Sequence, residues 1–251
     1  MNLLLLEPED FLPDGTAQVS GRRFRQLHEV IKAVPGKLCK AGVVNGPIGS
    51  AEILSMDRDE AHLRFEAHGA PPPPLNVVLL CALPRPLTFA KVIHSAVTCG
   101  VKDIHFFHSA KVEKSYWQSS KLTPEAIRGE VTLALEQCGD TVPPRIGFHR
   151  RFRSFVEDEV PQLVPDNASL LFGSPGASEP VPVGAAIGVP VVLAVGPEGG
   201  FNDFEEQLWQ SSGFRAVSLG RRILRSEFAV NALLTLLGAV QNADAVERRR
   251  D

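Results

Sequence analysis

Two short glycine-containing loops near the C-terminal end of the chain carry the residues best suited to binding a small polar ligand. The first is Gly196–Gly200 (GPEGG), and the second is Gly220–Arg222 (GRR), followed closely by Arg225 and Glu227. Glycines let another group approach the backbone closely, so both loops can offer free N–H and C=O groups to a ligand. A purely structural turn does not require three arginines and a carboxylate, so the second loop favours a binding role.

Each loop is expected to follow a strand and to precede a helix. The apolar, β-branched run Val191–Val195 predicts a buried strand before the first loop. After that loop, Asn202 is placed to cap a helix, and Glu205 completes a capping box. A short strand over Ala216–Leu219 and an apolar helix over Ser226–Val240 flank the second loop. Ligands of open α/β sheets bind beyond the carboxyl ends of strands, although either loop alone also fits an ordinary βα turn.

The composition excludes binding modes that depend on bulk charge or on membrane insertion. The chain has 251 residues and a formal net charge of -3, enough length for one large domain or two ordinary ones. A slightly negative charge argues against nucleic-acid binding through bulk charge, but not against a local basic patch. The arginines between Arg145 and Arg153 are interpreted as a solvated surface. No run reaches membrane-spanning length and no signal-peptide core is found, so we expect a cytoplasmic protein without membrane contact.

Neither the cysteines nor the histidines form a metal-binding pattern. The four cysteines are scattered without a CxxC pair, which favours buried thiols in a reducing compartment over disulfides or a zinc site. His105 and His108 lie three positions apart at a predicted strand end, so their side chains are expected on opposite faces. The sequence therefore predicts no bound metal.

A proline-rich segment divides the chain into two predicted domains. Residues 1–68 combine a helical pattern over Gly21–Ala33 with short alternating strands, which is typical of a small β-barrel domain. Residues 69–74 include four consecutive prolines and are predicted to form a stiff extended linker. Residues 75–251 alternate between apolar strands and helical segments, which predicts an α/β domain with a mostly parallel sheet.

The two loop motifs occur together in a known family. The run Val195–Phe201 (VGPEGGF), followed by Leu219–Ala229 (LGRRILRSEFA), resembles the paired motifs of the RsmE-type ribosomal RNA methyltransferases, which belong to the SPOUT class. The resemblance covers most of the chain. It implies an α/β C-terminal domain tied in a deep trefoil knot, preceded by a PUA-like β-barrel domain. Phe228 departs from the threonine that the family usually has at this position.

The resemblance implies an enzyme that methylates RNA. The cofactor would be S-adenosyl-L-methionine, and the target would be N3 of a specific uridine in 16S ribosomal RNA, on the assembled small ribosomal subunit. A sulfonium methyl is already activated, so the difficult step is loss of the N3 proton, which spreads negative charge onto O2 and O4. Arg225 is expected to stabilise that charge. Glu198 and Glu227 are both candidates for orienting this arginine or for taking the proton, and the sequence does not rank them.

The same resemblance implies binding residues around the loops and in the N-terminal domain. Cofactor contacts are expected mainly from the main chain of three segments: Leu171, Phe172, Gly196, Pro197, Glu198, Gly199, Gly200, Leu219, Gly220, Ile223 and Leu224. RNA contacts are expected from six basic residues: Arg22, Arg23, Arg25, Lys32, Lys114 and Arg222. A solvated helix face is the alternative for the four N-terminal residues. The segment Lys114–Ser119 fits a partly buried surface loop, or a loop whose two aromatic residues touch RNA or stack a base.

Partners and alternative functions follow from the same comparison. The resemblance implies a homodimer formed through the last helix, Phe228–Val240, although its apolar faces also fit a fully buried helix. A SPOUT methyltransferase acting on another RNA, such as transfer RNA, is one alternative. Departures from the family pattern at Thr98, Asp140 and Phe228 keep a non-catalytic, RNA-binding ribosome-assembly factor open. A dinucleotide-dependent oxidoreductase is disfavoured, because no G-x-G-x-x-G follows the first strand.

Overall fold

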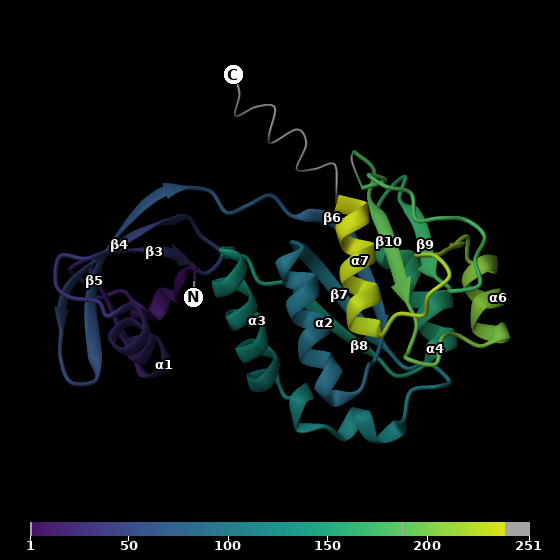
Figure 1. The fold of residues 1–251 in the computed structure, drawn as a ribbon, viewed down its shortest axis with the longest axis horizontal. Helices are drawn as coiled ribbons and strands as arrows, with labels where there is room; N and C mark the ends of the chain where they lie inside the picture. Colours follow the sequence, from purple (N-terminus) through teal and green to yellow (C-terminus); the bar gives the residue numbers. More distant parts are fainter. Residues whose placement is uncertain (1, 187, 239–251) are drawn as a thin grey trace. The chain divides into compact units, whose positions relative to one another are not determined.

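The computed structural model describes residues 2–186 and 188–238. Residues cluster into two units within it. The first unit contains the chain up to Pro73 together with Val131–Pro143, and the second contains Pro74–Glu130 together with the chain from Pro144 on. Figure 1 shows the elements of both units coloured along the sequence. No helix among the described residues is long and apolar enough to cross a membrane.

The first unit is built on a barrel-like, five-stranded mixed sheet. Its strands follow the spatial order β1-β3-β4-β5-β2. They span β1 Leu4–Leu6, β2 Ala17–Ser20, β3 Leu38–Val43, β4 Ile48–Met56 and β5 Glu60–Gly69. The pair β1 and β3 is parallel, and the other neighbouring pairs are antiparallel. The predicted hairpin turn joins β3 to β4, and Asn45 within it takes a left-handed φ of 58°.

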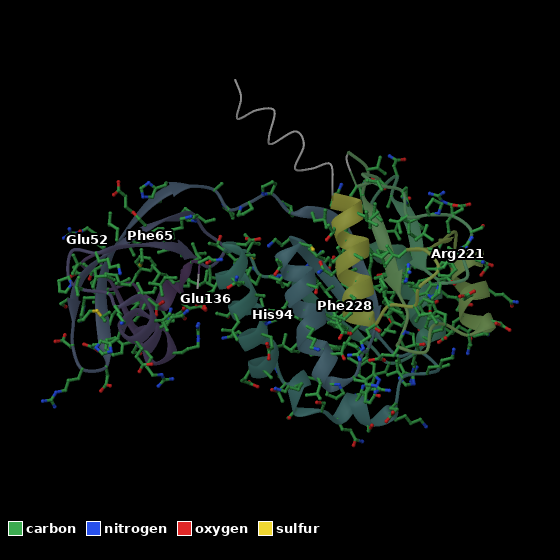
Figure 2. All side chains as sticks on the ribbon, in the orientation of Figure 1. Glu52, Phe65, His94, Glu136, Arg221 and Phe228 are labelled. Atoms are coloured by element: carbon green, nitrogen blue, oxygen red, sulfur yellow. The ribbon has the colours of Figure 1, made fainter. Side chains whose placement is uncertain are left out.

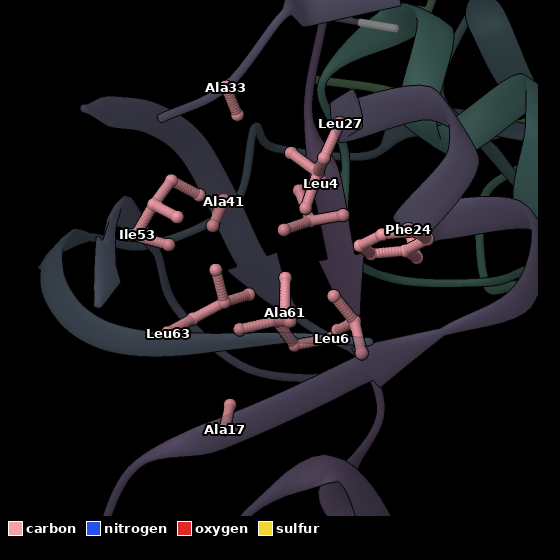
Figure 3. Packing of buried hydrophobic residues seen from close by; sticks show 12 residues of the cluster. Leu4, Leu6, Ala17, Phe24, Leu27, Ala33, Ala41, Ile53, Ala61 and Leu63 are labelled. Atoms are coloured by element: carbon pink, nitrogen blue, oxygen red, sulfur yellow. The ribbon is translucent and has the colours of Figure 1, made fainter. Parts of the chain in front are cut away.

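Apolar residues from these strands form the core of the first unit, as Figure 3 shows. Leu4 of β1, Ile53 of β4 and Leu63 of β5 are fully buried. Burial alternates along the first part of β4, as expected for a strand with one face on a core. Phe24 and Leu27 add apolar surface to this cluster from the helical segment that follows β2.

The helix predicted over Gly21–Ala33 forms in two parts. The α-helix α1 spans Gly21–Arg25, and a π-helix continues it over Gln26–Ile31. The segment ends at Lys32, whose φ of 51° is the left-handed conformation that commonly terminates helices. Apolar spacing alone did not indicate the wider π turns, because it fits an ordinary α-helix equally well.

The second unit is an α/β domain around a six-stranded parallel sheet. The strand order is β11-β9-β10-β6-β7-β8, and every neighbouring pair is parallel. The strands span β6 Leu75–Ala82, β7 Val101–Phe107, β8 Arg145–His149, β9 Ser169–Gly173, β10 Val191–Val195 and β11 Arg215–Val217. Every residue of β10 is buried, as expected for a strand covered on both faces. The predicted α/β class with a parallel sheet is confirmed.

Helices cover both faces of this sheet. They are α2 Pro86–Thr98, α4 Phe152–Ser154, α5 Val160–Leu163, α6 Asp203–Ser211 and α7 Ser226–Gly238, with α3 Pro124–Cys138 divided between the two units. Helices α2 and α7 lie side by side (Figure 1). Successive aromatic residues of β7 point to opposite faces. Phe106 packs on Phe89 of α2 with ring centroids 4.8 Å apart, and Phe107 packs on Trp209 of α6 at 5.7 Å.

The proline-rich segment joins the last strand of the first unit to the first strand of the second. Strand β5 ends at Gly69, and β6 begins at Leu75. Residues 131–143, which the sequence analysis included in the C-terminal domain, cluster with the first unit. The division into domains over residues 1–68 and 75–251 stays a prediction. The last two residues of the predicted helix Ser226–Val240 lie outside the described residues.

Candidate active site

The carboxyl ends of β9, β10 and β11 surround a cavity of about 580 Å³. Its walls are the loops that follow these strands, and the first turns of α7 complete it. All of Gly196–Gly200 and most of Leu219–Leu224 line the cavity, so the structure brings the two loop motifs together. A volume in this range is typical of small-molecule and cofactor pockets. Figure 2 shows the side chains on the ribbon, with Arg221 of the second loop and Phe228 of α7 labelled.

Two separate observations favour glycine in the first loop. Gly200 has a φ of 68°, a left-handed conformation that residues with a side chain rarely adopt. A Cβ on Gly199 would lie 2.8 Å from Cδ of Lys111. That lysine runs along the loop and donates from Nζ to the Gly199 carbonyl at 2.6 Å. Lys111 does not line the cavity, so the loop is held from one side while its main chain faces the cavity on the other.

The second loop combines a glycine turn with exposed apolar residues. Gly220 has a φ of 105°, and its N–H donates to the Ser218 hydroxyl oxygen at 3.1 Å, which fixes the turn. Ile223 and Leu224 follow at the cavity wall, and Ile223 is 81% exposed. Exposed apolar side chains at the mouth of a cavity provide surface that a bound ligand can cover.

The third wall comes from residues just beyond those predicted. Leu171 and Phe172 are fully buried inside β9, where their main chains pair with β10 on one side and β11 on the other. Residues paired on both sides have no free backbone group to offer a ligand. This part of the cavity is lined instead by Gly173, the last residue of β9, and by Ser174, Pro175 and Gly176, which follow the strand. Leu171 and Phe172 therefore lie outside the cavity wall, and their predicted cofactor contacts stay a prediction.

A polar pair in the cavity wall was not predicted from the sequence. The Ser174 hydroxyl donates to Oε1 of Glu206 at 2.9 Å, and both residues line the cavity. They also line a second cavity, of about 440 Å³. Glu206 lies in the acidic first turn of α6, where the helix dipole by itself favours carboxylates. A glutamate at this position therefore did not indicate a binding role in the sequence.

The two candidate catalytic carboxylates occupy different places. Glu198 lines the cavity, and its Oε1 accepts the backbone N–H of Arg85 at 3.1 Å, at the amino end of α2. The helix dipole favours a negative charge at that position. Glu227 is 7% exposed and does not line the cavity. Its Oε1 lies 3.5 Å from Nζ of Lys91, so this carboxylate ties α7 to α2.

The predicted catalytic arginine lies at the edge of the cavity. Arg225 is exposed and immediately precedes α7, where its carbonyl accepts the N–H groups of Phe228 and Ala229. Within the described residues, no hydrogen bond or ion pair joins Arg225 to Glu198 or Glu227. The structure thus brings Glu198 together with the two loop motifs and, among the described residues, leaves the guanidinium of Arg225 without a carboxylate partner.

Helix α6 is joined to the segment that follows β7 by a buried carboxylate. Glu205 is 2% exposed, and its Oε1 accepts the Ala110 N–H at 2.7 Å while its Oε2 accepts the Asn202 N–H at 3.0 Å. Asn202 accepts the Glu205 N–H in return at 2.8 Å, so the predicted capping box is confirmed. Lys111, the residue after Ala110, adds the contact to the first loop described above.

The residues predicted to contact RNA differ in whether they already form ion pairs with carboxylates. Arg22 donates two hydrogen bonds to Glu136, at 2.7 and 2.8 Å, and Arg23 pairs with Asp10. Both guanidiniums therefore have carboxylate partners, and neither belongs to a simple solvated helix face. A phosphate contact by either would compete with these ion pairs. The remaining candidates are exposed and have no ion pair among the described residues: Arg25, Lys32, Lys114 and Arg222.

A buried histidine pair links β7 and β8 to a π-helix over Phe155–Glu159. Nδ1 of His105 lies 2.9 Å from Nε2 of His149, and Nε2 of His105 lies 3.0 Å from Oδ1 of Asp103. Nδ1 of His149 lies 2.7 Å from Oε2 of Glu159. Burial lowers the pKa of His105, and this outweighs the opposing effect of Asp103. The His105 ring is therefore neutral at neutral pH.

One group of side chains has the spacing of metal ligands. Among the described residues, Asp57, Glu60 and His62 place one ligand atom each within 4.8 Å of one another, at the turn between β4 and β5. Glu60 already bonds Gln18 and His62. Exposed acidic groups of this kind occur commonly without an ion, so the group carries no assignment.

A family profile described as an RNA methyltransferase domain matches residues 71–238, well over half of the chain. The chain belongs to this family. The match includes every residue that lines the cavity. The RNA methyltransferase domain therefore coincides with the sheet and loops that build the candidate site.

Curated relatives extend the similarity beyond the RNA methyltransferase domain. A protein named ribosomal RNA small subunit methyltransferase E from Treponema pallidum is 30% identical over 256 residues, which cover 99% of this chain and 94% of the relative. The protein of the same name from Synechocystis sp. is 27% identical, with 94% of this chain and 77% of the relative covered. The predicted resemblance to the RsmE-type enzymes is confirmed.

Solved structures share the fold of this RNA methyltransferase. A ribosomal RNA small subunit methyltransferase E from Neisseria gonorrhoeae, bound to S-adenosyl methionine, matches with a TM-score of 0.73 at 23% identity, covering 96% of this chain and 98% of that one. A putative methyltransferase from Legionella pneumophila, in complex with the same cofactor, matches with a TM-score of 0.75 at 22% identity, covering 95% and 97%. At these identities the matches establish the fold.

Proposed function

We propose that this protein transfers a methyl group from S-adenosyl-L-methionine to ribosomal RNA of the small subunit. The observation that carries the proposal is the cavity at the ends of β9, β10 and β11, which both family motifs line. A relative that matches 99% of this chain is named as a small-subunit ribosomal RNA methyltransferase. Two structures with the same fold hold S-adenosylmethionine.

The residues around the cavity fit this methyl donor. The turns at Gly200 and Gly220 expose main-chain groups that can bond the adenine and the methionine portion. Ile223 and Leu224 supply apolar surface for the adenine ring. Glu206 supplies a carboxylate that can accept from a ribose hydroxyl or from the methionine ammonium. When bound, the cofactor supplies a sulfonium methyl that accepts the nucleophile's electron pair as its C–S bond breaks.

The target atom that suits these residues is N3 of a uridine in 16S ribosomal RNA. Arg225 does not itself line the cavity, but it lies between Leu224 and Ser226, which both do, and this position supports a role for its guanidinium at a base bound there. Its positive charge stabilises the negative charge that develops on O2 and O4 as the N3 proton leaves. Arg222 lines the cavity and adds a second positive charge.

The positions of the two carboxylates support different roles for them. Glu198 lines the cavity and has one oxygen held by the Arg85 N–H, so it is the carboxylate placed to take the N3 proton. Glu227 is buried against Lys91 away from the cavity, so it positions α7, which begins next to Arg225. In this assignment Glu227 is a positioning residue.

The finer features of the family are proposed on the same basis. The C-terminal domain is proposed to carry the deep trefoil knot and the N-terminal β-unit to be a PUA-like, RNA-binding domain. Phe228 is 58% exposed on the first turn of α7, which supports the proposal of a homodimer that covers this helix. The substrate is proposed to be the assembled small subunit, which places the protein in the cytoplasm.

Cofactor binding and methyl transfer test the proposal separately. Calorimetry should detect S-adenosylmethionine binding to the purified protein, and the protein should methylate small ribosomal subunits that lack the mark. Arg225→Ala should lower the rate roughly 100-fold or more while cofactor binding is retained, since it removes a charge needed in the transition state. Arg215→Ala is the matched control, because this exposed arginine pairs with Glu179 instead.

Each outcome discriminates between functions. Absence of cofactor binding would exclude a methyltransferase. Methylation of transfer RNA but not of small subunits would redirect the substrate assignment. Cofactor and subunit binding without methyl transfer would identify an assembly factor, and full activity of Arg225→Ala would reject the role of that arginine.

A further inference from the structure

A cluster of aromatic and basic side chains lies at the carboxyl ends of β7 and β8, outside the cofactor cavity. Trp117 donates from Nε1 to Nδ1 of His108 at 3.0 Å. The guanidinium carbon of Arg150 lies 4.8 Å from the centroid of the Trp117 ring, a cation–π contact. Phe148 meets the same indole edge-on with centroids 6.3 Å apart. We name these four residues the Trp117 platform.

The platform is accessible and positively charged. Arg150 is exposed, Phe148 is 37% exposed and Trp117 is half-buried, so the stacked pair faces solvent. Among the described residues, neither Arg150 nor the nearby Lys114 forms an ion pair. Arg153, by contrast, is neutralised by Glu157 at 2.9 Å. Arg150 is thus exposed, as predicted for a solvated surface, and its guanidinium also lies over the Trp117 ring.

The histidine in the platform is held in one hydrogen-bonding state. Burial, together with the nearby charges of Lys114 and Arg150, lowers the pKa of His108. The ring is therefore neutral at neutral pH and can accept the indole N–H at Nδ1. That bond fixes the orientation of the Trp117 ring plane before any ligand arrives.

The segment that carries the platform also touches the cofactor loop. Residues 108–118 follow β7, and within them Lys111 donates to the Gly199 carbonyl and Ala110 donates to Glu205 of α6. Neighbouring strands are about 4.8 Å apart, and only β6 separates β7 from β10. The platform thus lies within roughly 10 to 20 Å of the cavity, a span of a few nucleotides.

We propose that the Trp117 platform stacks an unpaired base of the substrate RNA that flanks the methylated nucleotide. Unpaired bases stack on aromatic rings and on guanidinium planes, and phosphates bind the exposed cations beside them. Arg150 over Trp117 supplies both surfaces in one place, and Lys114 adds the charge. The inference rests on the proposed function and extends it by giving the RNA a second point of attachment, which orients the target base toward the cavity.

Binding of single-stranded RNA, measured separately from cofactor binding, tests the platform. The probe is a short, unstructured RNA, and the control probe is an abasic ribose-phosphate oligomer of the same length. Trp117→Ala should weaken RNA binding roughly 5- to 100-fold, the range found when a stacking aromatic is truncated. Trp117→Phe should keep most of the affinity. Arg150→Lys keeps the charge but loses the planar guanidinium, so it should weaken RNA binding more than the same exchange would at an arginine that contacts only a phosphate.

Two further measurements separate stacking from damage to the fold. In subunit methylation, Trp117→Ala should raise KM for the RNA substrate more than it lowers kcat, while calorimetry shows unchanged affinity for S-adenosylmethionine. RNA should quench wild-type tryptophan fluorescence, and the quenching should vanish in Trp117→Phe, because Trp209 is fully buried. Arg153→Ala is the matched control and should bind RNA as the wild type does.

Several results would overturn the inference while the proposed function stands. These are unchanged RNA affinity and KM in Trp117→Ala, absence of quenching in the wild type, and equal affinity for the abasic oligomer, which would indicate charge alone. An acidic polypeptide that competes as well as RNA would likewise show that the patch is not a base-stacking site. If the wild type failed to methylate subunits yet RNA binding depended on Trp117, the proposed function would fail and the platform would stand.

Discussion

The carboxyl edge of the parallel sheet exposes main-chain groups in one region and large side chains in another. At β9, β10 and β11 it consists of glycine turns whose main chain lines a cavity. At β7 and β8 the same edge consists of large side chains, with Trp117, His108 and Arg150 in direct contact. The segment with Ala110 and Lys111 joins the two regions.

The difference matches the ligands that each region would bind. A methyl donor always has the same chemical structure, so main-chain groups with one fixed arrangement can bind it closely. A pocket of this kind is sensitive to changes in backbone conformation. An RNA strand presents varied bases and mobile phosphates, which aromatic rings and cations bind without a single required geometry. Backbone substitutions should therefore damage the first region most, and side-chain substitutions the second.

Gly220→Val gives the largest expected effect on this comparison. The native φ of 105° is strained for any other residue and most of all for a β-branched one, at a cost of about 1–3 kcal/mol. Cofactor affinity measured by calorimetry should fall by up to that amount, roughly 5- to 150-fold, while binding of single-stranded RNA persists. Gly129→Ala in α3 is the control, because a Cβ there meets open space. Retained cofactor affinity in Gly220→Val would mean that this turn does not shape the pocket.

Glu206→Gln asks whether the cofactor region depends on the main chain alone. Removing one charged acceptor should weaken cofactor binding roughly tenfold, corresponding to about 1.5 kcal/mol for a hydrogen bond to a charged group. Asp203→Asn is the control, since this exposed residue of the same helical turn does not line the cavity. A loss as large as that in Gly220→Val would break the contrast between the two regions.

The buried His105 gives the smallest expected effect. The pKa of His105 is lowered in the folded state from its ordinary value of 6.5. As the pH falls below 6.5, the imidazole therefore binds a proton in the unfolded chain but stays neutral in the folded one. Stability should therefore fall toward acid pH, and His105→Gln should flatten part of that slope. Denaturant unfolding between about pH 7.5 and pH 5.5 measures it.

A matched histidine sharpens this result. His94→Gln is the control in the same unit, because His94 lies at the surface of α2 beside Glu130 and not within the buried pair. An identical slope in wild type and His105→Gln would show that folding leaves the pKa of His105 unchanged, so that Asp103 offsets the effect of burial.

The secondary-structure elements around the cavity were predictable because a few neighbouring residues determine each of them. The run Val191–Val195 is long, apolar and β-branched, and it forms the fully buried strand β10. The spacing of Asn202 and Glu205 predicted a capping box that the structure contains. The rule for strand ends in open sheets then led to the edge of the sheet at which the structure has its cavity.

Contacts between distant residues were not predictable from one sequence. Arg22 pairs with Glu136 far along the chain, so its residue type alone indicated only a free cation. Leu171 and Phe172 lie inside β9 and not at the cavity wall, and their pairing with both β10 and β11 could not be read from the sequence. The stacking of Arg150 on Trp117 depends on β7 and β8 being neighbours in the sheet, and hydrophobic periodicity in the sequence does not reveal the strand order.

The buried carboxylate of Glu205 has a consequence for the timing of local opening. Each of its oxygens holds one amide, that of Ala110 after β7 and that of Asn202 at the start of α6. Neither amide can be released alone without leaving a buried negative charge short of a donor. Amide hydrogen exchange at Ala110 and Asn202 should therefore proceed at matched rates, so that the segment after β7 and the start of α6 open together.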